Sequence, residues 1–301
     1  MRFPIRMLWI VCVLLLETGL QAGPFDGRRV VIDPRASNAA SMTTAMPASG
    51  TVEVCVRVAS YNIAHARGNE EGKTKNEIAR KENLDGIANL LKSHRIDVAG
   101  FTEISKGDLR AKFRNQPKYL ADHAGGMHYV YAENYRRAFG LLATQGNAVL
   151  SRFPILRSQN HKLYRSDEKH EQRGCLEALL DLGNDRRLRV LVAHLSLEAD
   201  ESARQIEEIW DMVRTSPEPV LLLGDFNSRP KSDRIKWLSS RMNDATANVG
   251  TTFLNKPGVK IDYIFSYGPV RAGTAFVEGF EEGYSDHGCL INEFRIAYPR
   301  K

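Results

Sequence analysis

Strand-like apolar segments recur along the chain from residue 51 to residue 294, and they limit the possible folds more strongly than any other feature. Residues 51–61 (TVEVCVRVASY) carry valine at alternate positions, which is the period of a β-strand with one buried face. Eight further segments have strand character: 96–102, 128–131, 148–151, 175–181, 188–195, 220–223, 261–266 and 289–294. Residues 78–91 and 202–213 instead have apolar positions at helical spacing. So many strands with so few helices predict one α/β domain of two packed sheets with helices outside.

The composition agrees with a folded globular protein. Hydrophobic residues make up 43% and charged residues 26% of the 301 residues, which excludes a wholly disordered chain. The sequence has no run of eighteen apolar residues, so a polytopic helical membrane protein is excluded as well.

The first 22 residues have the character of an export signal. Arg2 and Arg6 precede an apolar run at 7–16, whose length suits a secretory signal peptide, and Ala22 is a suitable cleavage position. An uncleaved membrane anchor and a buried core helix are the alternatives. We therefore expect a signal peptide at 1–22, a flexible linker at 23–52 and a folded domain at 53–298, in a protein exported to the periplasm or secreted.

The segment 220–230 (VLLLGDFNSRP) places two polar side chains at the end of a buried strand. Asp225 and Asn227 are two positions apart, so in an extended chain their side chains converge. The carboxylate can accept a proton from water or hold a cation, and the amide can donate to an anionic oxygen. The alternative is an ordinary strand-exit turn, in which both residue types are common.

Two later segments carry further candidates. In 284–288 (YSDHG), Asp286 and His287 are adjacent just before the last strand, which suits a metal ligand beside an imidazole. In 260–265 (KIDYIF), Asp262 lies inside an apolar strand, where a carboxylate must be paired or change its pKa. A turn with a surface histidine and a solvent-facing aspartate are the simpler interpretations.

Three more polar residues end or interrupt apolar strands, namely Asn62, Glu103 and His194. A histidine in such a strand is often only a hydrogen-bonded core residue. Taken together, however, polar residues at so many strand ends indicate a ligand site along one edge of the sheets, where open sheets place their sites.

Seven motifs in a fixed order resemble the endonuclease/exonuclease/phosphatase superfamily, which has the DNase I-like fold. They are SYNI (60–63), FTEI (101–104), GNAVLSRFPI (146–155), AHLSL (193–197), GDFNSRP (224–230), KIDYIF (260–265) and YSDHG (284–288). The resemblance extends from residue 53 to about 296 and is closest to small exported metal-dependent hydrolases. It implies a four-layer α/β (α+β) sandwich of two mainly antiparallel sheets flanked by helices.

The resemblance also implies roles for the polar residues. Glu103 matches the carboxylate that binds a divalent ion, with Asn62 beside it and Asp286 joining the metal site. Asp225 matches the residue that positions and deprotonates the attacking water, and Asn227 matches the one that holds the phosphate.

The remaining roles concern the histidines. His194 matches a residue that contacts the scissile phosphate and helps to protonate the leaving oxygen. Asp262 matches the partner that orients His287, and Asn147 lies near the substrate in many relatives. The sequence departs from the family in having Thr102 where glutamine is frequent.

The expected activity is therefore a phosphoesterase that uses Mg²⁺, or Mn²⁺, to hydrolyse phosphate esters by direct attack of water, as a phosphodiesterase or nuclease. Its partners would be nucleic acid, a phospholipid head group or a soluble phosphate ester, bound by a monomer. Basic segments at 136–140 (RRAFG) and 184–189 (NDRRLR) suit phosphate-rich partners, although they could simply be solvated surface. A catalytically silent phosphate-binding module and a membrane-tethered interaction protein on the same fold are the alternatives.

Overall fold

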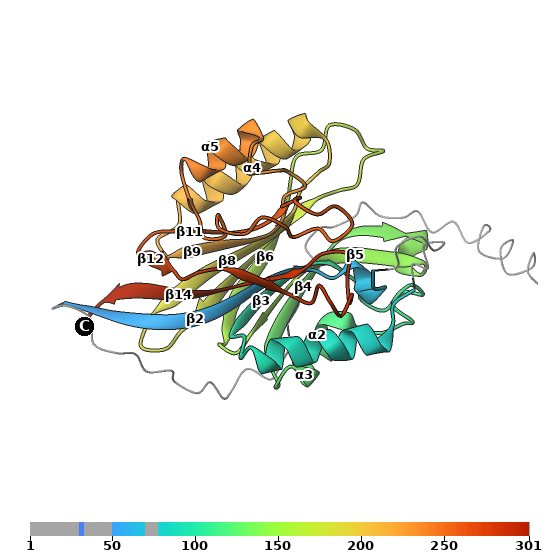
Figure 1. The fold of residues 1–301 in the computed structure, drawn as a ribbon, viewed down its shortest axis with the longest axis horizontal. Coiled ribbons are helices and arrows are strands. Elements are labelled where there is room, and N and C mark those ends of the chain that lie inside the picture. The colour runs from blue at the N-terminus through green and yellow to red at the C-terminus, as the bar shows by residue number, and fades with distance from the viewer. Residues whose placement is uncertain (1–29, 33–49, 70–77, 301) are drawn as a thin grey trace, which may run out of the picture.

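The computed structural model describes residues 30–32, 50–69 and 78–300. Within these residues, two β-sheets pack face to face (Figure 1). The larger sheet contains β1 (Val30–Ile32), β2 (Thr51–Asn62), β3 (Val98–Ile104), β4 (His128–Arg137), β5 (Ala143–Ser151), β12 (Val270–Ala272), β13 (Phe276–Glu278) and β14 (Cys289–Pro299). The smaller sheet contains β6 (Ile155–Lys162), β7 (Gly174–Asp181), β8 (Arg187–His194), β9 (Val220–Asp225), β10 (Asn243–Asp244) and β11 (Asp262–Tyr267).

Both sheets are mainly antiparallel, and each has one parallel pair of strands. The larger sheet has the order β1-β4-β5-β3-β2-β14-β12, with β13 also paired to β14, and its parallel pair is β2 with β3. The smaller sheet has the order β10-β11-β9-β8-β7-β6, and its parallel pair is β8 with β9. The C-terminal ends of these four paired strands carry polar residues identified from the sequence, namely Asn62, Glu103, His194 and Asp225.

Helices complete the four layers. The helices of the described ranges are α2 (Lys81–Ser93), α3 (Gln116–His123), α4 (Ala199–Arg214) and α5 (Asp233–Ser239), with short 3₁₀ turns η1 (Ala64–Ala66) and η2 (Ala138–Gly140). In Figure 1, α2 and α3 cover the outer face of the larger sheet, and α4 and α5 cover that of the smaller one. The expected four-layer sandwich of two mainly antiparallel sheets is confirmed.

Apolar side chains fill three layers. The sheets meet over a cluster that includes Val58 of β2, Val192 of β8 and Leu223 of β9. Helix α2 packs Leu84, Ile87 and Leu91 against the larger sheet, and α4 packs Ile206, Ile209 and Val213 against the smaller one. Spacings of three and four residues place each of these sets on one helical face. Burial of these stripes explains why the segments with the clearest helical period form the outer layers.

Some elements lack a strong sequence pattern. Strand β6 at the edge of the smaller sheet is largely polar, and the helices α3 and α5 are short, so none of them was predicted. Residues 30–32 form β1 inside the expected linker, and β2 begins at Thr51. The expected signal peptide lies outside the described residues, as does most of the linker. No helix in the described part of the chain has the length and apolarity needed to span a membrane.

Candidate active site

Strand pairing brings three of the predicted residues into one row. The parallel pairing of β8 with β9 aligns His194 with Asp225, and the antiparallel pairing of β9 with β11 aligns Asp225 with Asp262. All three side chains are buried. The row therefore crosses the smaller sheet at the point where β8 and β9 end.

The glycine of the GDFN motif allows the strands to approach at this row. Gly224 has a φ of +140°, and a Cβ atom at this position would lie 1.9 Å from the carbonyl oxygen of Ala193 in the neighbouring strand. No side chain fits in that space, so only glycine lets β9 pair closely with β8 beside the site. The sequence requirement for glycine is thus a requirement of strand pairing.

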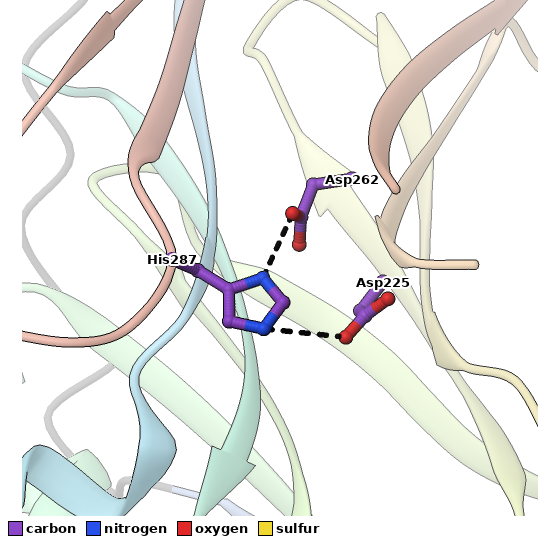
Figure 2. A group of neighbouring side chains, drawn as sticks. All are labelled: Asp225, Asp262 and His287. Carbon is purple, nitrogen blue, oxygen red and sulfur yellow. Dashed lines mark hydrogen bonds and ion pairs between the residues drawn. The ribbon is translucent and has the colours of Figure 1, made fainter. Parts of the chain in front are cut away.

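Asp262 and His287 form a buried pair (Figure 2). Asp262 Oδ2 lies 2.9 Å from His287 Nδ1, and both residues are almost fully buried. Burial alone would lower the pKa of His287, but the charge and hydrogen bond of Asp262, with help from Asp225, outweigh it and raise this pKa to about 10. The ring of Phe253 packs edge-on against His287, with 5.0 Å between ring centroids. His287 is therefore held in place as a cation.

Three nitrogen atoms converge on one oxygen of Asp225. Its Oδ2 accepts a hydrogen bond of 3.0 Å from Asn62 Nδ2 and lies 3.6 Å from His194 Nε2 and 3.8 Å from His287 Nε2. The two longer separations exceed hydrogen-bond length, so both imidazole edges can serve another oxygen placed among them. Burial, followed by the charge of Asp262, raises the pKa of Asp225 well above its ordinary value.

Asn62 connects the two sheets at the site. Its amide nitrogen donates to Asp225 at 3.0 Å and also lies 3.2 Å from Glu103 Oε1, while its Oδ1 accepts from the backbone of Ala64 at 3.0 Å. Asn62 ends β2 in the larger sheet and Asp225 ends β9 in the smaller one. One side chain thus fixes the position of carboxylates from both sheets.

Glu103 lies at an irregularity of β3. The register between β3 and β5 shifts between Phe101 and Ile104, and Glu103 has a φ of +48°. Such left-handed backbone is uncommon for a residue other than glycine, and bulges of this kind redirect a side chain. The bulge places Glu103 beside Asn62 and His194, whose Nε2 is 4.0 Å from Glu103 Oε1.

His65 also faces Glu103, and it was not among the predicted residues. Ser105 Oγ donates to the carbonyl oxygen of Thr144 at 2.8 Å and lies 2.9 Å from His65 Nδ1, so it accepts from that nitrogen. Burial, then the charges of Arg110 and Arg67, holds the pKa of His65 well below its usual range. The unprotonated Nε2 of the neutral ring then lies 3.5 Å from Glu103 Oε2. Two electron-rich atoms at this distance favour a cation, or its bound water, between them.

Arg173 contacts the other histidine and was likewise missed. Its Nη1 lies 3.0 Å from His194 Nδ1, and both side chains are buried. Burial, followed by the charges of Arg173, His287 and His65, lowers the pKa of His194 well below its usual range. The sequence signal for this contact is weak, because an arginine at the start of a strand is common.

The two remaining asparagines differ in what they can offer a ligand. Asn227, with a φ of +47°, donates one amide hydrogen to the carbonyl of Leu195 at 2.9 Å. An amide nitrogen carries two hydrogens, so this bond uses one of them. Asn147 Nδ2 donates to the carbonyls of Gly174 at 2.8 Å and Val192 at 3.1 Å, which uses both. Asn147 thus ties β5 to the smaller sheet, and the substrate contact expected of it remains a prediction.

Asp286 is paired with an arginine in this structure. Its Oδ2 lies 2.9 Å from Arg67 Nη2, and its Oδ1 is 3.5 Å from Ser285 Oγ. Among the described residues, one group of three histidine, cysteine or acidic side chains has ligand atoms within 4.8 Å of one another, and it consists of Asp225, Asp262 and His287. A metal site that includes Asp286 together with Glu103 remains a prediction.

The side chains around Glu103 offer ligand atoms that suit a hydrated divalent cation. The Glu103 carboxylate, part of which is exposed, offers the hard oxygen ligand that Mg²⁺ and Mn²⁺ prefer. The unprotonated nitrogen of His65 can accept from a water of such an ion. Asn62 steadies the carboxylate from the other side.

One known protein family matches most of the chain. The sequence profile of the Endonuclease/Exonuclease/phosphatase family matches residues 59–287. No curated protein sequence is significantly similar to the chain.

Solved structures share the fold at low sequence identity. An endonuclease/exonuclease/phosphatase from Beutenbergia cavernae DSM 12333 is 19% identical over 80% of this chain and 72% of its own, with a TM-score of 0.65. The human Nocturnin catalytic domain with a bound sulfate anion is 17% identical over 81% and 95%, with a TM-score of 0.62. A mannosyl-6-phosphatase from Bacteroides thetaiotaomicron VPI-5482 is 18% identical over 79% and 99%, with a TM-score of 0.61.

Proposed function

Because the chain belongs to the endonuclease/exonuclease/phosphatase family, we propose that it is a divalent-metal-dependent hydrolase of phosphate esters. The convergence of Asn62, His194 and His287 on one oxygen of Asp225 supports this proposal. A carboxylate surrounded by hydrogen-bond donors can hold a water and share its donors with a phosphate oxygen. Such an arrangement suits an attack of water on phosphorus.

Asp225 acts as the base in this proposal. Its raised pKa makes it a better proton acceptor than an ordinary aspartate once it is ionised, since the basicity of a carboxylate increases with its pKa. His287 supplies a fixed positive charge beside it, because Asp262 holds the ring as a cation. That charge stabilises the negative charge that develops on the phosphate oxygens during attack.

His194 and Asn227 provide neutral donors. With Nδ1 occupied by Arg173, the hydrogen of the His194 ring is on Nε2, which faces the space beside Asp225 and Glu103. Asn227 has an amide hydrogen left after its bond to Leu195. Both donors can bind non-bridging oxygens of a phosphate and orient it for attack.

A divalent cation would be held by Glu103, with Asn62 and His65 around it. When bound, Mg²⁺ or Mn²⁺ neutralises phosphate charge and assists the leaving oxygen. Asp286 would join this set if it exchanged Arg67 for the ion. The role of the chain is to fix the carboxylate by the bulge at Glu103 and by its contact with Asn62.

The substrate class is a phosphate ester, either a diester or a monoester. Similar folds occur in a mannosyl-6-phosphatase and in Nocturnin with bound sulfate, which supports testing monoesters beside diesters. We further propose that the protein acts as a monomer. We also propose that it is exported by its N-terminal segment, which N-terminal sequencing of the mature protein would test.

An activity screen with a matched variant tests the enzymatic proposal. Purified protein with Mg²⁺ or Mn²⁺ would be assayed on bis-p-nitrophenyl phosphate, p-nitrophenyl phosphate, plasmid DNA, RNA, sphingomyelin and inositol phosphates. At least one ester should be hydrolysed by the wild type and not by Asp225→Asn, which preserves the shape of the side chain. If the protein is a catalytically silent binding module, it would bind an ester, and turnover by the wild type and by Asp225→Asn would be the same and at background level.

A further inference from the structure

Exposed apolar side chains gather on two neighbouring loops. Of the nine large hydrophobic residues that are exposed in the described part of the chain, five lie in the β3–α3 loop or at the β4–β5 turn. These five form what we call the apolar platform: Leu109, Phe113, Phe139, Leu141 and Leu142. Phe139 is 84% exposed and Phe113 is 61% exposed. Several exposed apolar side chains on neighbouring loops are typical of an interaction site, whereas single exposed ones are normal on a protein surface.

The two loops are joined into one unit. The backbone nitrogen of Leu109 donates to the carbonyl of Leu141 at 2.9 Å. Asp108, which is fully buried, accepts from the backbone of Ala111 at 2.6 Å and from both the backbone and the hydroxyl of Thr144. The platform is therefore held by a buried carboxylate that links both loops.

Backbone conformation points the same way. Lys112 and Phe113 have φ values of +51° and +57°, and Ala138 and Phe139 have +48° and +55°. Bulky side chains are disfavoured in this left-handed region, where glycine and asparagine are the usual residues. Each phenylalanine thus occupies a position that costs folding stability and buries little of its ring. A contact outside the chain would account for both features.

The platform has a basic surround. Residues 105–116 and 133–145 contain six lysines and arginines and two carboxylates, a net charge of 6 − 2 = +4. One of the carboxylates, Asp108, is buried, and the other, Glu133, pairs with Arg136 at 2.6 Å. Lys112 and Arg137 are exposed close to the two phenylalanines in the sequence. The surround is therefore complementary to a negatively charged surface.

The platform lies at the same end of the sandwich as the candidate site. Strand β3 reaches Glu103 just before its loop begins, and β5 starts at the other loop (Figure 1). Ser105 contacts both Thr144, which Asp108 links to the platform loops, and His65, which faces Glu103. The basic segment at 184–189 instead lies at the opposite end of β8 from His194.

We propose that the apolar platform docks the protein onto the surface of an anionic phospholipid bilayer, with Phe113 and Phe139 inserted and Lys112 and Arg137 at the head groups. Three of the five platform residues are leucines, which enter lipid well but do not stack on nucleic-acid bases. The leucines of the platform therefore favour a bilayer over single-stranded nucleic acid as its partner. Docking of this kind does not depend on catalysis, so it can hold even where the proposed activity fails.

Vesicle binding by the full-length chain tests the proposal. Co-sedimentation would be measured with two kinds of vesicle. One is phosphatidylcholine alone, and the other contains about 30 mol% phosphatidylserine to reproduce an anionic leaflet. The double variant Phe113→Asn/Phe139→Asn removes both rings and suits the left-handed backbone. It should lower the partition coefficient on anionic vesicles about tenfold or more. Lys112→Gln/Arg137→Gln should also lose about tenfold, and only on anionic vesicles.

A matched control removes exposed apolar side chains elsewhere. Leu156 and Phe276 are 48% and 42% exposed and lie on β6 and β13, outside both loops. Leu156→Asn/Phe276→Asn should bind anionic vesicles like the wild type. In addition, Phe139→Trp should show a vesicle-dependent blue shift of its fluorescence above the wild-type background, and Phe276→Trp should not.

Three outcomes would overturn the proposal. Equal vesicle binding by the platform variant and the wild type would assign any membrane affinity to another segment, including the apolar run at 7–16. A loss of oligonucleotide binding without a loss of vesicle binding would assign the platform to nucleic acid. If the wild type sediments as a dimer and the platform variant as a monomer, with vesicle binding unchanged, the platform would be a contact between two copies of the chain.

Discussion

Arg173 and His194 are joined by a buried hydrogen bond of 3.0 Å between Nη1 and Nδ1. A guanidinium can only donate, so His194 Nδ1 must accept and the ring hydrogen must be on Nε2. The lowered pKa of His194, caused by burial and then by Arg173, agrees with a neutral ring. This geometry favours His194 as a neutral donor to phosphate over a cationic acid that protonates the leaving group.

Replacement of Arg173 should release this control. In Arg173→Met, His194 loses the donor that fixes its tautomer and a nearby positive charge, so its pKa should rise. Turnover should fall about 10²-fold, on the scale of a lost proton-transfer or donor group. Nitrogen NMR of the ring should show Nδ1 unprotonated in the wild type and a titrating ring in the variant. Arg173→Lys, which can still donate, should recover part of the activity; an unchanged ring spectrum in Arg173→Met would contradict the assignment.

Asp225 and His287 should behave as a coupled unit. Asp225→Ala and His287→Ala should each lower turnover about 10²-fold or more. The double variant should lose far less than the product of the two effects, because both groups act on the same water and phosphate. Turnover on the ester found by the screen gives the measurement, and circular dichroism checks folding. Full additivity would indicate that the two residues act independently.

Metal dependence should depend on Glu103. EDTA should abolish hydrolysis and Mg²⁺ or Mn²⁺ should restore it, because the donors near Glu103 suit a hydrated hard ion. Glu103→Gln should weaken Mn²⁺ binding, measured by calorimetry, and should leave the thermal unfolding temperature of the metal-free protein nearly unchanged. Activity that persists in chelator would exclude this cation from the mechanism.

The pH dependence should be bell-shaped and should move when Asp262 is changed. Activity requires ionised Asp225 and protonated His287, so it rises above the elevated pKa of Asp225 and falls near pH 10 as His287 loses its proton. Asp262→Asn removes a charge that raises both pKa values, while the burial that is the larger cause for Asp225, and that lowers the pKa of His287, remains. Both limbs should then shift to lower pH, the alkaline limb by several units. A profile of kcat/KM from pH 5 to 11 measures the shift, and an unmoved alkaline limb would contradict the role of the pair.

Gly224→Ala should destabilise the fold. The added methyl group would meet the carbonyl of Ala193 at 1.9 Å, at a backbone φ of +140°. Relief requires movement of two paired strands, at a cost of about 2–3 kcal/mol of unfolding free energy or more. The control Gly250→Ala, with no atom within 4 Å of the added Cβ, should change stability by about 0.5 kcal/mol or less. Urea denaturation of the two variants would separate the effects, and equal midpoints would disprove the close approach.

Much of the fold could be predicted from local sequence periodicity. Buried strands such as β9 and amphipathic helices such as α4 carry their own pattern, because one face of each must be apolar. Strand β6 could not be recognised in this way. It lies at a sheet edge and is mostly polar, so its strand conformation follows from pairing with β7 and not from a buried face.

The candidate site divides in the same manner. The strand-end residues Asn62, Glu103, His194, Asp225 and Asp262 were identified from the sequence, since each follows or interrupts an apolar run. His65 and Arg173 carry no such signal. Their importance comes from the atoms that they contact, His65 through Glu103 and Arg173 through His194.

The sequence alone determined the strands and helices that have a buried apolar face, the polar residues that end those strands, and the family that the ordered motifs resemble. Those features depend on residues a few positions apart, so they can be recognised in short stretches of the sequence. Only the tertiary structure brought Asn62 to Asp225, 163 positions apart, set the tautomer of His194, and joined the two loops that carry Phe113 and Phe139. Hydrogen bonds and exposure are set by atoms that folding brings close from distant segments, so no local pattern specifies them.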